Sequence, residues 1–383
     1  MTKHSDSKTK VGFVFSNDPD PLLVERMRAL EESGEFEAHA IFWHRAGSDL
    51  RFPFSPDPFS ADRFTKVELP DPRAGALKRV WLTFRFSKFL RQWWKENQFD
   101  VLHIVYPNML VAANFAMLGK KTPLVYDVWD VQPKPGVSSL KRFMTRTLLR
   151  KTPHVFSTSQ AFIDSHLKTH DLLPSGIAAT NVSNAPYSRE ALPKADRGER
   201  LVVGCLGNLR VQKQIRMLVD AVAEVRERGH DVMVRLSGAG SKKQFVETLT
   251  GDHSFVKYTG PYDYHRDAPS LYAELDLVYA VYPLDVYNYR VHIARRLHDA
   301  VLSQTPIIVS SDSANAEIVE NEQIGWCVGY ESLADLVRAI TAACENRELL
   351  REKANNTKKV RDKHCFEGYR EAYLAAYRRI ANR

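Results

Sequence analysis

Short apolar segments alternate with amphipathic segments along the first half of the chain. The apolar segments are rich in β-branched and aromatic residues, which is typical of buried strands, and they cover residues 11–16, 36–43, 100–106, 123–129 and 154–158. Helical spacing of apolar residues occurs between them, over 21–33, 76–98, 109–118 and 138–151. Strands buried on both faces and separated by helices predict a parallel, doubly wound α/β sheet. Residues 47–75, rich in proline, aspartate and phenylalanine, predict a long surface excursion.

A polar stretch then interrupts the alternation and predicts two domains. Residues 183–200 contain two prolines and lack apolar periodicity, which is typical of a linker. Alternation resumes at Leu201, with helices predicted over 213–228, 241–250, 290–303, 314–321 and 332–345. We therefore expect two Rossmann-like domains that face each other across a cleft, with an N-terminal domain over 1–185, a linker over 186–200, a C-terminal domain over 201–365 and a final amphipathic helix over 366–383.

The composition constrains location and partners. Of the 383 residues, 44% are hydrophobic and 26% are charged, as in soluble two-domain proteins. The cysteines are far apart in sequence, which predicts reduced thiols rather than disulfides or a zinc site: Cys205, Cys327, Cys344 and Cys365. The chain starts without a signal peptide and has no membrane-spanning apolar run, so we expect a cytoplasmic protein. The net charge of +8 predicts an anionic partner, which could be nucleic acid, a phospholipid surface or a phosphorylated small molecule.

The segment GNLRVQK, residues 207–213, has the features of an anion site. It follows a predicted strand and brings Arg210 and Lys213 to the start of a predicted helix. The N-terminus of a helix offers unbonded N–H groups and the positive end of the helix dipole, both of which favour phosphate. The segment matches neither the Walker loop nor the dinucleotide fingerprint. Since ligands of doubly wound domains lie beyond the carboxyl ends of the strands, we expect this loop to open into the cleft.

Three segments of the second half together resemble the nucleotide-sugar-binding half of GT-B glycosyltransferases, in particular the family-4 (group 1) retaining enzymes. GNLRVQK resembles the family's G-R-L-x-x-x-K-G loop, RRLHDAVLSQTPIIVSS its K-L-x-E-A-x-x-x-G-x-P-V-I segment, and NAEIVENEQIGWCV its E-I-V-x-x-G-x-x-G-x-x-V stretch. The resemblance covers most of residues 100–380, including a final helix that crosses back to the N-terminal domain. It implies retaining transfer of a sugar from a nucleotide-diphosphate sugar to a glycan or lipid-linked acceptor, in surface polysaccharide or glycoconjugate synthesis.

The resemblance also implies roles for individual residues. Lys213, supported by Arg210, would neutralise the donor diphosphate, and Asp299 would hold the ribose hydroxyls. The rest of the implied donor site consists of Gly207, Asn208, Tyr262 near the nucleobase, Asn288 and Arg290 near the transferred sugar, Arg296 and Glu317. In the first half, YDVWD (126–130) is similar to a Y-D-V-H-D stretch, which makes Asp127 and Asp130 catalytic candidates. The chain departs from the family at Val291, where a glutamate is usual, and at Trp129, where a histidine is usual.

The implied chemistry is expected to need neither a metal nor a cofactor. Negative charge grows on the departing diphosphate, and Arg210, Lys213 and Arg296 together with helix N–H groups can stabilise it. Front-face attack with retention, which the resemblance implies, does not use the carboxylate pair of a retaining glycosidase. Asp18-Pro19-Asp20 spells the metal-binding D-x-D of the other glycosyltransferase fold, but the prolines around it favour a turn.

Several candidates have simpler interpretations. Asp299 lies three and four residues after Arg296 and Arg295, so it is alternatively one partner of a surface helix ion pair. Lys213 is alternatively a solvated lysine of a first helical turn. His103, on an apolar strand, is interpreted as a hydrogen-bonded core histidine.

Residues 76–98 predict a basic helix rich in aromatic residues. Its cations and aromatic residues are Lys78, Arg85, Lys88, Arg91 and Lys95 beside Trp81, Phe84, Phe89, Trp93 and Trp94. Such helices suit an anionic membrane surface, which fits a protein peripheral to the inner face of a membrane and a polyprenyl-linked acceptor. The alternative is a packed helix whose aromatic residues belong to the core.

Three other functions share some of these features. A sugar-nucleotide epimerase of GT-B type would turn over the donor without an acceptor. A nucleotide-sugar-binding pseudoenzyme or accessory subunit, suggested by Val291 and Trp129, would bind the donor without transfer. A nucleic-acid binder is suggested by charge alone, and since the sequence contains no recognition motif, we predict no nucleic-acid partner.

Overall fold

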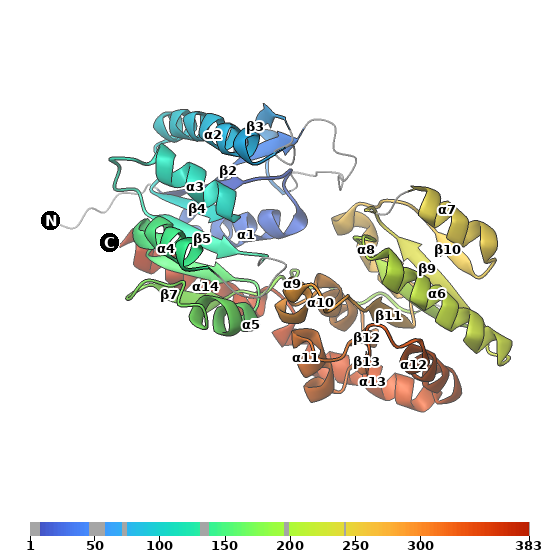
Figure 1. The fold of residues 1–383 in the computed structure, drawn as a ribbon. Coiled ribbons are helices and arrows are strands. Elements are labelled where there is room, and N and C mark those ends of the chain that lie inside the picture. Colours follow the sequence, from blue (N-terminus) through green and yellow to red (C-terminus); the bar gives the residue numbers. More distant parts are fainter. Residues whose placement is uncertain are drawn as a thin grey trace. The chain divides into compact units, whose positions relative to one another are not determined.

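The computed structural model describes residues 8–45, 58–70, 75–130, 138–194, 199–240 and 243–382. They form two compact units, each built on one parallel sheet with helices on both faces (Figure 1). Unit 1 contains the described residues from 8 to 130, from 138 to 183 and from 369 to 382, and unit 2 contains those from 184 to 368. The predicted fold class, α/β with two doubly wound domains, is confirmed.

The sheet of unit 1 has seven strands in the order β3-β2-β1-β4-β5-β6-β7. They are β1 (Thr9–Phe15), β2 (Phe36–Arg45), β3 (Phe64–Leu69), β4 (Val101–Val105), β5 (Leu124–Val128), β6 (His154–Ser157) and β7 (Ala178–Asn181). The five strands predicted in this half are confirmed. The prediction of a surface excursion over 47–75 is wrong for β3, whose Val67 and Leu69 are buried while the residues between and before them are exposed or half-buried. This alternation is typical of an edge strand with one face on the core.

Helices cover both faces of this sheet. The crossovers through α2 (Ala76–Asn97), α3 (Pro107–Ala116) and α4 (Ser139–Leu148) run in one direction along the sheet, so right-handed connection puts all three on one face (Figure 1). The crossover through α1 (Pro21–Glu31) runs in the opposite direction and lies on the other face. The C-terminal helix α14 (Glu367–Ala381) lies there too, since Cζ of Arg26 on α1 is 5.2 Å from the ring of Tyr373. Short turns complete the unit: η1 (Ala61–Arg63), η2 (Leu149–Lys151), α5 (Gln160–Phe162) and η3 (Ile163–Lys168).

The sheet of unit 2 has six strands in the order β10-β9-β8-β11-β12-β13. They are β8 (Leu201–Leu206), β9 (Val232–Ser237), β10 (Val256–Tyr258), β11 (Leu277–Ala280), β12 (Ile307–Ser310) and β13 (Gly325–Val328). One core cluster contains apolar residues of α6 (Gln212–Glu227), α7 (Lys243–Asp252) and α12 (Leu333–Glu345). The other contains those of α8 (Tyr264–Ala273), α10 (Arg295–Leu302) and α11 (Ala314–Glu322). The sheet thus has a separate apolar core on each face, as a doubly wound fold requires.

Two predictions for this half need correction. The helix expected over 290–303 is instead α9 (Tyr287–Val291) followed by α10, because the chain between them is held by Asn315. The side chain of Asn315 accepts a hydrogen bond from the N–H of Ala294 at 2.9 Å and donates one to the carbonyl of His292 at 3.0 Å. The helices α8 and α13 (Arg347–Val360) were not predicted. Among the described residues, no helix is both long and apolar enough to cross a bilayer.

Candidate functional site

Loops at the carboxyl ends of β8 and β9 touch each other through glycine backbones. Gly207 has φ +95° and Gly238 has φ +131°. A Cβ atom on Gly238 would lie 1.8 Å from the carbonyl oxygen of Gly207, so no other residue fits there. The N–H of Leu209 donates to the carbonyl of Ala239 at 2.8 Å. This close approach fixes the loop that contains the predicted anion-binding residues.

Arg296, a buried residue of α10, forms hydrogen bonds with the backbone of the same loop. It is 6% exposed, and its Nε and Nη2 donate to the carbonyl oxygens of Leu206 and Asn208, the second at 2.7 Å. Its Nη1 is buried without a hydrogen-bond partner among the described residues, and so is Oδ1 of Asn208. A buried guanidinium whose Nη1 is unused is a strong potential donor to an anion at this loop.

The predicted cations lie at the start of α6. Val211 is the N-cap residue and offers no side-chain acceptor, so the first-turn N–H groups of α6 have no capping side chain. Lys213, in that first turn, is 73% exposed, and its Nζ is 2.5 Å from a carboxylate oxygen of Glu331. This hydrogen bond raises the pKa of Lys213, with a smaller contribution from Asp285. Arg210 is exposed and forms no ion pair within the described part of the chain. Both cations are therefore accessible to an anionic ligand.

Asp299 is enclosed rather than paired on a helix surface. It is 2% exposed, and its Oδ1 accepts hydrogen bonds from Arg189 at 2.7 Å and from the hydroxyl of Tyr264 at 2.5 Å. Its Oδ2 has a long contact of 3.4 Å with the hydroxyl of Tyr272. The alternative of a surface pair with Arg295 or Arg296 is therefore wrong. Arg189, which the sequence placed in the linker, holds Oδ1, and Oδ2 retains capacity to accept a further hydrogen bond.

The other donor-site candidates have different surroundings. Tyr262 is half-buried, with its hydroxyl 3.8 Å from the position of a Cβ atom on Gly207. Arg290 is exposed and its Nε donates to the carbonyl of Leu284 at 2.6 Å. Asn288 is half-buried on α9, and Glu317 is exposed in the first turn of α11.

Aromatic rings join α9 to the anion loop. The Tyr282 ring stacks on Tyr289 of α9 at 5.1 Å, and Cζ of Arg296 lies 5.6 Å from the same Tyr282 ring. The structure thus brings Gly207, Asn208 and Arg296 into contact, places Tyr262 beside them, and connects α9 to them.

In unit 1, Asp127 belongs to a buried network of charges. It is fully buried at the end of β5, 3.5 Å from Nε of Arg26 and 3.3 Å from Nε2 of His103. Burial acts to raise the pKa of Asp127, but Arg26 and His103 outweigh it, so this pKa lies below its ordinary value. Nδ1 of His103 is 2.5 Å from the hydroxyl of Tyr377 on α14, which confirms the interpretation of His103 as a hydrogen-bonded core residue. Since Asp127 is enclosed by protein and held by Arg26 and His103, the geometry favours a structural role, and its catalytic role stays a prediction.

Trp129 and Asp130 follow directly at the carboxyl end of β5. The Trp129 ring lies 5.2 Å from Phe15 and 6.0 Å from Tyr106, so it closes an aromatic cluster over the ends of β1, β4 and β5. Asp130 is exposed. Of the two aspartates predicted as catalytic, Asp130 is the one that a substrate can reach.

The D-x-D segment is a helix start. Asp20 is the N-cap residue of α1, its Oδ1 accepts a hydrogen bond from the N–H of Leu23 at 3.0 Å, and Pro21 begins the helix. Asp18 instead contacts Nδ1 of His44 at 2.6 Å. The sequence predicted a turn here, and the structure instead has a short bend that ends in a helix cap. Within the described ranges, no three His, Cys, Asp or Glu side chains are grouped so that they could hold a metal ion, and the four cysteines are unpaired.

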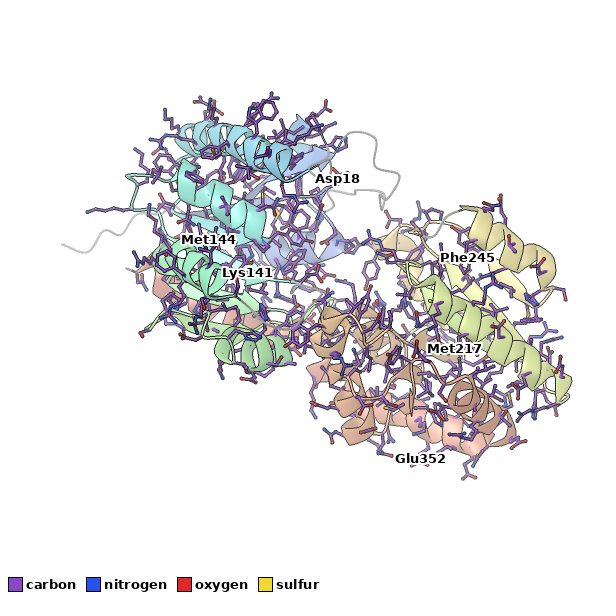
Figure 2. All side chains as sticks on the ribbon, viewed as in Figure 1. Asp18, Lys141, Met144, Met217, Phe245 and Glu352 are labelled. Carbon is purple, nitrogen blue, oxygen red and sulfur yellow. The ribbon has the colours of Figure 1, made fainter. Side chains whose placement is uncertain are left out.

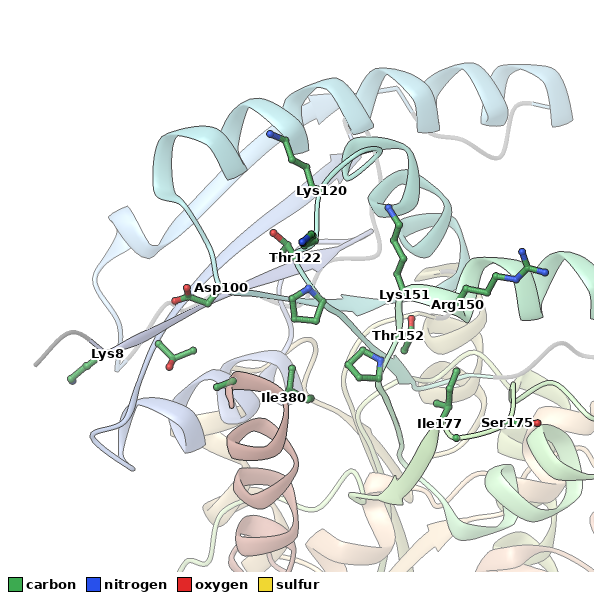
Figure 3. A pocket seen from close by; sticks show the side chains of 16 residues that line it. Lys8, Asp100, Lys120, Thr122, Arg150, Lys151, Thr152, Ser175, Ile177 and Ile380 are labelled. Atoms are coloured by element: carbon green, nitrogen blue, oxygen red, sulfur yellow. The ribbon is translucent and has the colours of Figure 1, made fainter. Parts of the chain in front are cut away.

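A hollow of about 1110 Å³ lies in unit 1 around the amino ends of β1, β4, β5 and β6, which is the end of the strands away from Asp127 and Asp130 (Figure 3). Lysines line it, but two of them are engaged elsewhere. The Nζ of Lys120 is 5.1 Å from the Trp94 ring, and the Nζ of Lys151 donates to the carbonyl of Met117 at 2.8 Å. Since ligands of open parallel sheets bind at the carboxyl ends of the strands, this hollow is not the candidate site.

Known families match both halves of the chain. The family "Glycosyl transferases group 1" matches residues 200–346, and the family "Glycosyl transferase 4-like domain" matches residues 23–170. A phosphatidyl-myo-inositol mannosyltransferase from Mycobacterium leprae is 22% identical over 290 residues, which are 74% of this chain and 74% of that protein.

Solved structures share the fold over nearly the whole chain. Sucrose-phosphate synthase from Thermosynechococcus elongatus has a TM-score of 0.73 and 15% identity, over 97% of this chain and 99% of that one. HepE from Anabaena, in complex with UDP and glucose, has a TM-score of 0.68 and 16% identity, over 96% of this chain and 99% of that one. At these identities, the likeness to solved structures shows a common fold.

Proposed function

The chain belongs to the group 1 glycosyltransferases and has the GT-B fold, and on this premise we propose that it transfers a sugar from a nucleoside-diphosphate sugar with retention of anomeric configuration. One observation supports the donor class most directly. The uncapped start of α6 presents two accessible cations, Arg210 and Lys213, beside a loop held by the buried Arg296. HepE, whose structure holds UDP and glucose, supports a donor of the same class.

In the proposed reaction, the diphosphate lies against the 207–213 loop and the start of α6. Lys213 leaves Glu331 for the phosphate, an exchange that costs little because both side chains are largely exposed. The bond from the anomeric carbon to the phosphate oxygen breaks, and the acceptor hydroxyl attacks that carbon from the same face. The departing phosphate oxygen takes the proton of the hydroxyl. Arg210 and Lys213 stabilise the charge that grows on this leaving group.

A panel of nucleotide sugars tests the proposal and separates it from its alternatives. Donor at about 100 times its Kd should raise the free energy of unfolding by about 2.7 kcal/mol, which thermal shift detects. Transfer to an acceptor, with the anomeric configuration of the product read by NMR, should show retention. Donor turnover without acceptor would instead indicate an epimerase. Binding without any turnover would indicate a pseudoenzyme or accessory subunit. This alternative is tested because Val291 and Trp129 depart from the residues usual in the family.

Transfer is expected to survive EDTA. The physical reason is that Arg210, Lys213 and helix N–H groups supply the positive charge that a divalent cation supplies in other transferases. The measurement is the initial rate of transfer after treatment with EDTA, with and without added Mg²⁺ or Mn²⁺. Loss of all activity on chelation, restored by either ion, contradicts this part of the mechanism.

Asp299→Asn is expected to weaken nucleotide binding by about ten- to a hundredfold, since hydrogen bonds to charged groups contribute about 1.5–3 kcal/mol. We propose that Oδ2, whose protein contact is long, accepts a hydrogen bond from a ribose hydroxyl. Isothermal titration with the preferred nucleotide measures the change. Tyr264→Phe is the matched control, because it removes a donor to the other oxygen, Oδ1. Lower stability of Asp299→Asn with unchanged nucleotide affinity would give Asp299 a purely structural role.

We propose a glycan or lipid-linked acceptor and a place at the inner face of a membrane, in surface polysaccharide or glycoconjugate synthesis. The mannosyltransferase that resembles this chain is named for a lipid acceptor, phosphatidyl-myo-inositol. The basic helix α2 supports a membrane location. Transfer of labelled sugar to lipid extracts, compared with transfer to water-soluble oligosaccharides, tests the acceptor class.

A further inference from the structure

We infer that the face of unit 1 formed by α2, α3 and α4 binds an anionic membrane, with α4 lying in the lipid interface. The inference deepens the proposed function, on which it rests for the lipid-linked acceptor, because it names the surface at which such an acceptor would be met. Membrane binding itself is measurable without any sugar transfer.

Exposed apolar side chains are concentrated on this face. Among the described residues, twelve large hydrophobic side chains are exposed, and the two that lie elsewhere are Leu192 and Leu333. The other ten lie on α2, α4, and α3 with the turn after it: Leu77, Val80, Trp81, Phe84, Phe89, Phe115, Leu118, Leu140, Phe143 and Met144. Phe84 and Phe115 pack together at 4.4 Å, so the apolar surface continues from α2 to α3. Concentrated exposure of this kind marks an interaction surface.

Both interpretations of the helix over 76–98, a packed core helix and a membrane-surface helix, describe part of α2. Leu82, Phe86, Leu90 and Trp93 of α2 are buried in the core of unit 1, as in a packed helix. Trp81, Phe84 and Phe89 are 54%, 44% and 45% exposed, as an interfacial helix requires. One side of α2 thus packs on the sheet while aromatic residues on other sides remain exposed.

Helix α4 is amphipathic, but it presents its apolar side outward. None of its residues is buried, and Leu140, Phe143 and Met144 are 69%, 63% and 53% exposed. Thr145 and Arg146 are half-buried, and Nη1 of Arg146 donates to the carboxylate of Asp171 at 2.5 Å and to the carbonyl of Asp171 at 2.9 Å. Lys141 is half-buried, and partial burial lowers its pKa (Lys141 and Met144 are labelled in Figure 2). A surface helix in water has the opposite arrangement.

The excess of positive charge on this face favours binding to a negatively charged bilayer. The helices α2, α3 and α4 contain one carboxylate, Glu96, and six exposed cations: Lys78, Arg79, Arg85, Lys88, Lys95 and Arg142. Interfacial helices combine apolar insertion with cations that contact anionic head groups. A second copy of the chain fits less well, because a two-fold interface would place this cationic face against itself. Contact between these helices makes the charges and the apolar residues one continuous surface.

Sedimentation with lipid vesicles tests the inference. The full chain should bind vesicles of phosphatidylglycerol and phosphatidylcholine, and it should bind vesicles of phosphatidylcholine alone much more weakly. Replacing Leu140, Phe143 and Met144 together with serine should lower the affinity by about tenfold or more, because the inserted apolar area is lost. Arg85→Gln with Lys88→Gln should lower it by about fivefold for each charge and reduce its dependence on salt.

The matched control is Lys358→Gln with Lys359→Gln, which removes two exposed cations from α13 in unit 2 and should leave vesicle binding unchanged. Unchanged melting temperature and nucleotide affinity show that each variant is folded. The inference is overturned if the wild type ignores anionic vesicles or if the serine variant binds them as well as the wild type does. It is also overturned if the apolar residues instead mediate a dimer that excludes vesicles. Vesicle binding without donor binding would refute the proposed function but would still support membrane binding by this face.

Discussion

Lys213→Ala is expected to lower kcat by about 100- to 1,000-fold, the size of effect seen when one donor to a developing negative charge is removed. Before donor binds, Lys213 is paired with Glu331, and this exposed pair gives way to phosphate at little cost. The positive charge then matters most when the bond to the sugar breaks and the diphosphate gains negative charge. The change should therefore affect kcat more than donor affinity.

Steady-state kinetics at saturating donor, together with titration of the nucleotide, separate the two effects. Lys257→Ala, which removes an exposed lysine of β10, is the matched control and should retain wild-type kcat. Glu331→Gln should bind donor at least as tightly as the wild type, since it removes the carboxylate that competes with phosphate. Weaker nucleotide binding by Lys213→Ala with unchanged kcat would mean that Lys213 serves binding and not departure of the leaving group.

Asp127→Ala is expected to destabilise unit 1 by about 3–5 kcal/mol, because it leaves the buried guanidinium of Arg26 without its counter-ion. The pKa of Asp127 is below its ordinary value, so its contribution to stability is present at neutral pH and is lost as the pH falls through the pKa of the folded state. The wild type should accordingly lose stability in acid, and the variant should show less of that dependence.

Urea unfolding followed by tryptophan fluorescence suits this measurement, because five of the six tryptophans lie in unit 1: Trp43, Trp81, Trp93, Trp94 and Trp129. Replacing the pair together, as Arg26→Met with Asp127→Leu, should recover much of the stability, since apolar pairs often replace buried ion pairs without loss. If Asp127→Asn unfolds like the wild type but does not transfer sugar, Asp127 is catalytic after all and our structural interpretation is wrong.

Short sequence motifs predicted the parts of the candidate site whose residues lie close together in sequence. The spacing of Gly207, Arg210 and Lys213 around a strand end and a helix start predicted where each would lie, because strand, turn and helix are all local structures. Most strands of both sheets were likewise predictable from apolar runs, but the two edge strands of unit 1 were missed. Proline-rich sequence around β3 hid a short alternation. The four residues of β7 are exposed or half-buried and form no apolar run.

The partners of Asp299 and Asp127 could not be predicted in this way. Arg189 is 110 residues from Asp299 in sequence, in a stretch with no apolar pattern, and only the folded chain brings the two together. The network of Asp127 joins α1, β4 and α14, which no local spacing relates. Periodicity predicted a helix around α4 but did not reveal which side faces outward, because that depends on the contacts that α4 makes with the rest of unit 1.

The C-terminal helix has a consequence for how the chain is made. Tyr373 packs on Phe156 at 4.9 Å, and Tyr377 packs on Phe36 at 5.7 Å and contacts His103, so residues made late complete the core of unit 1. The ribosome synthesises residues 369–382 only after every residue of unit 2. The unit whose synthesis begins first is therefore finished last. A nascent chain halted before residue 369 would leave the apolar surface under α14 uncovered, and we expect chaperones to hold that surface until residues 369–382 are made.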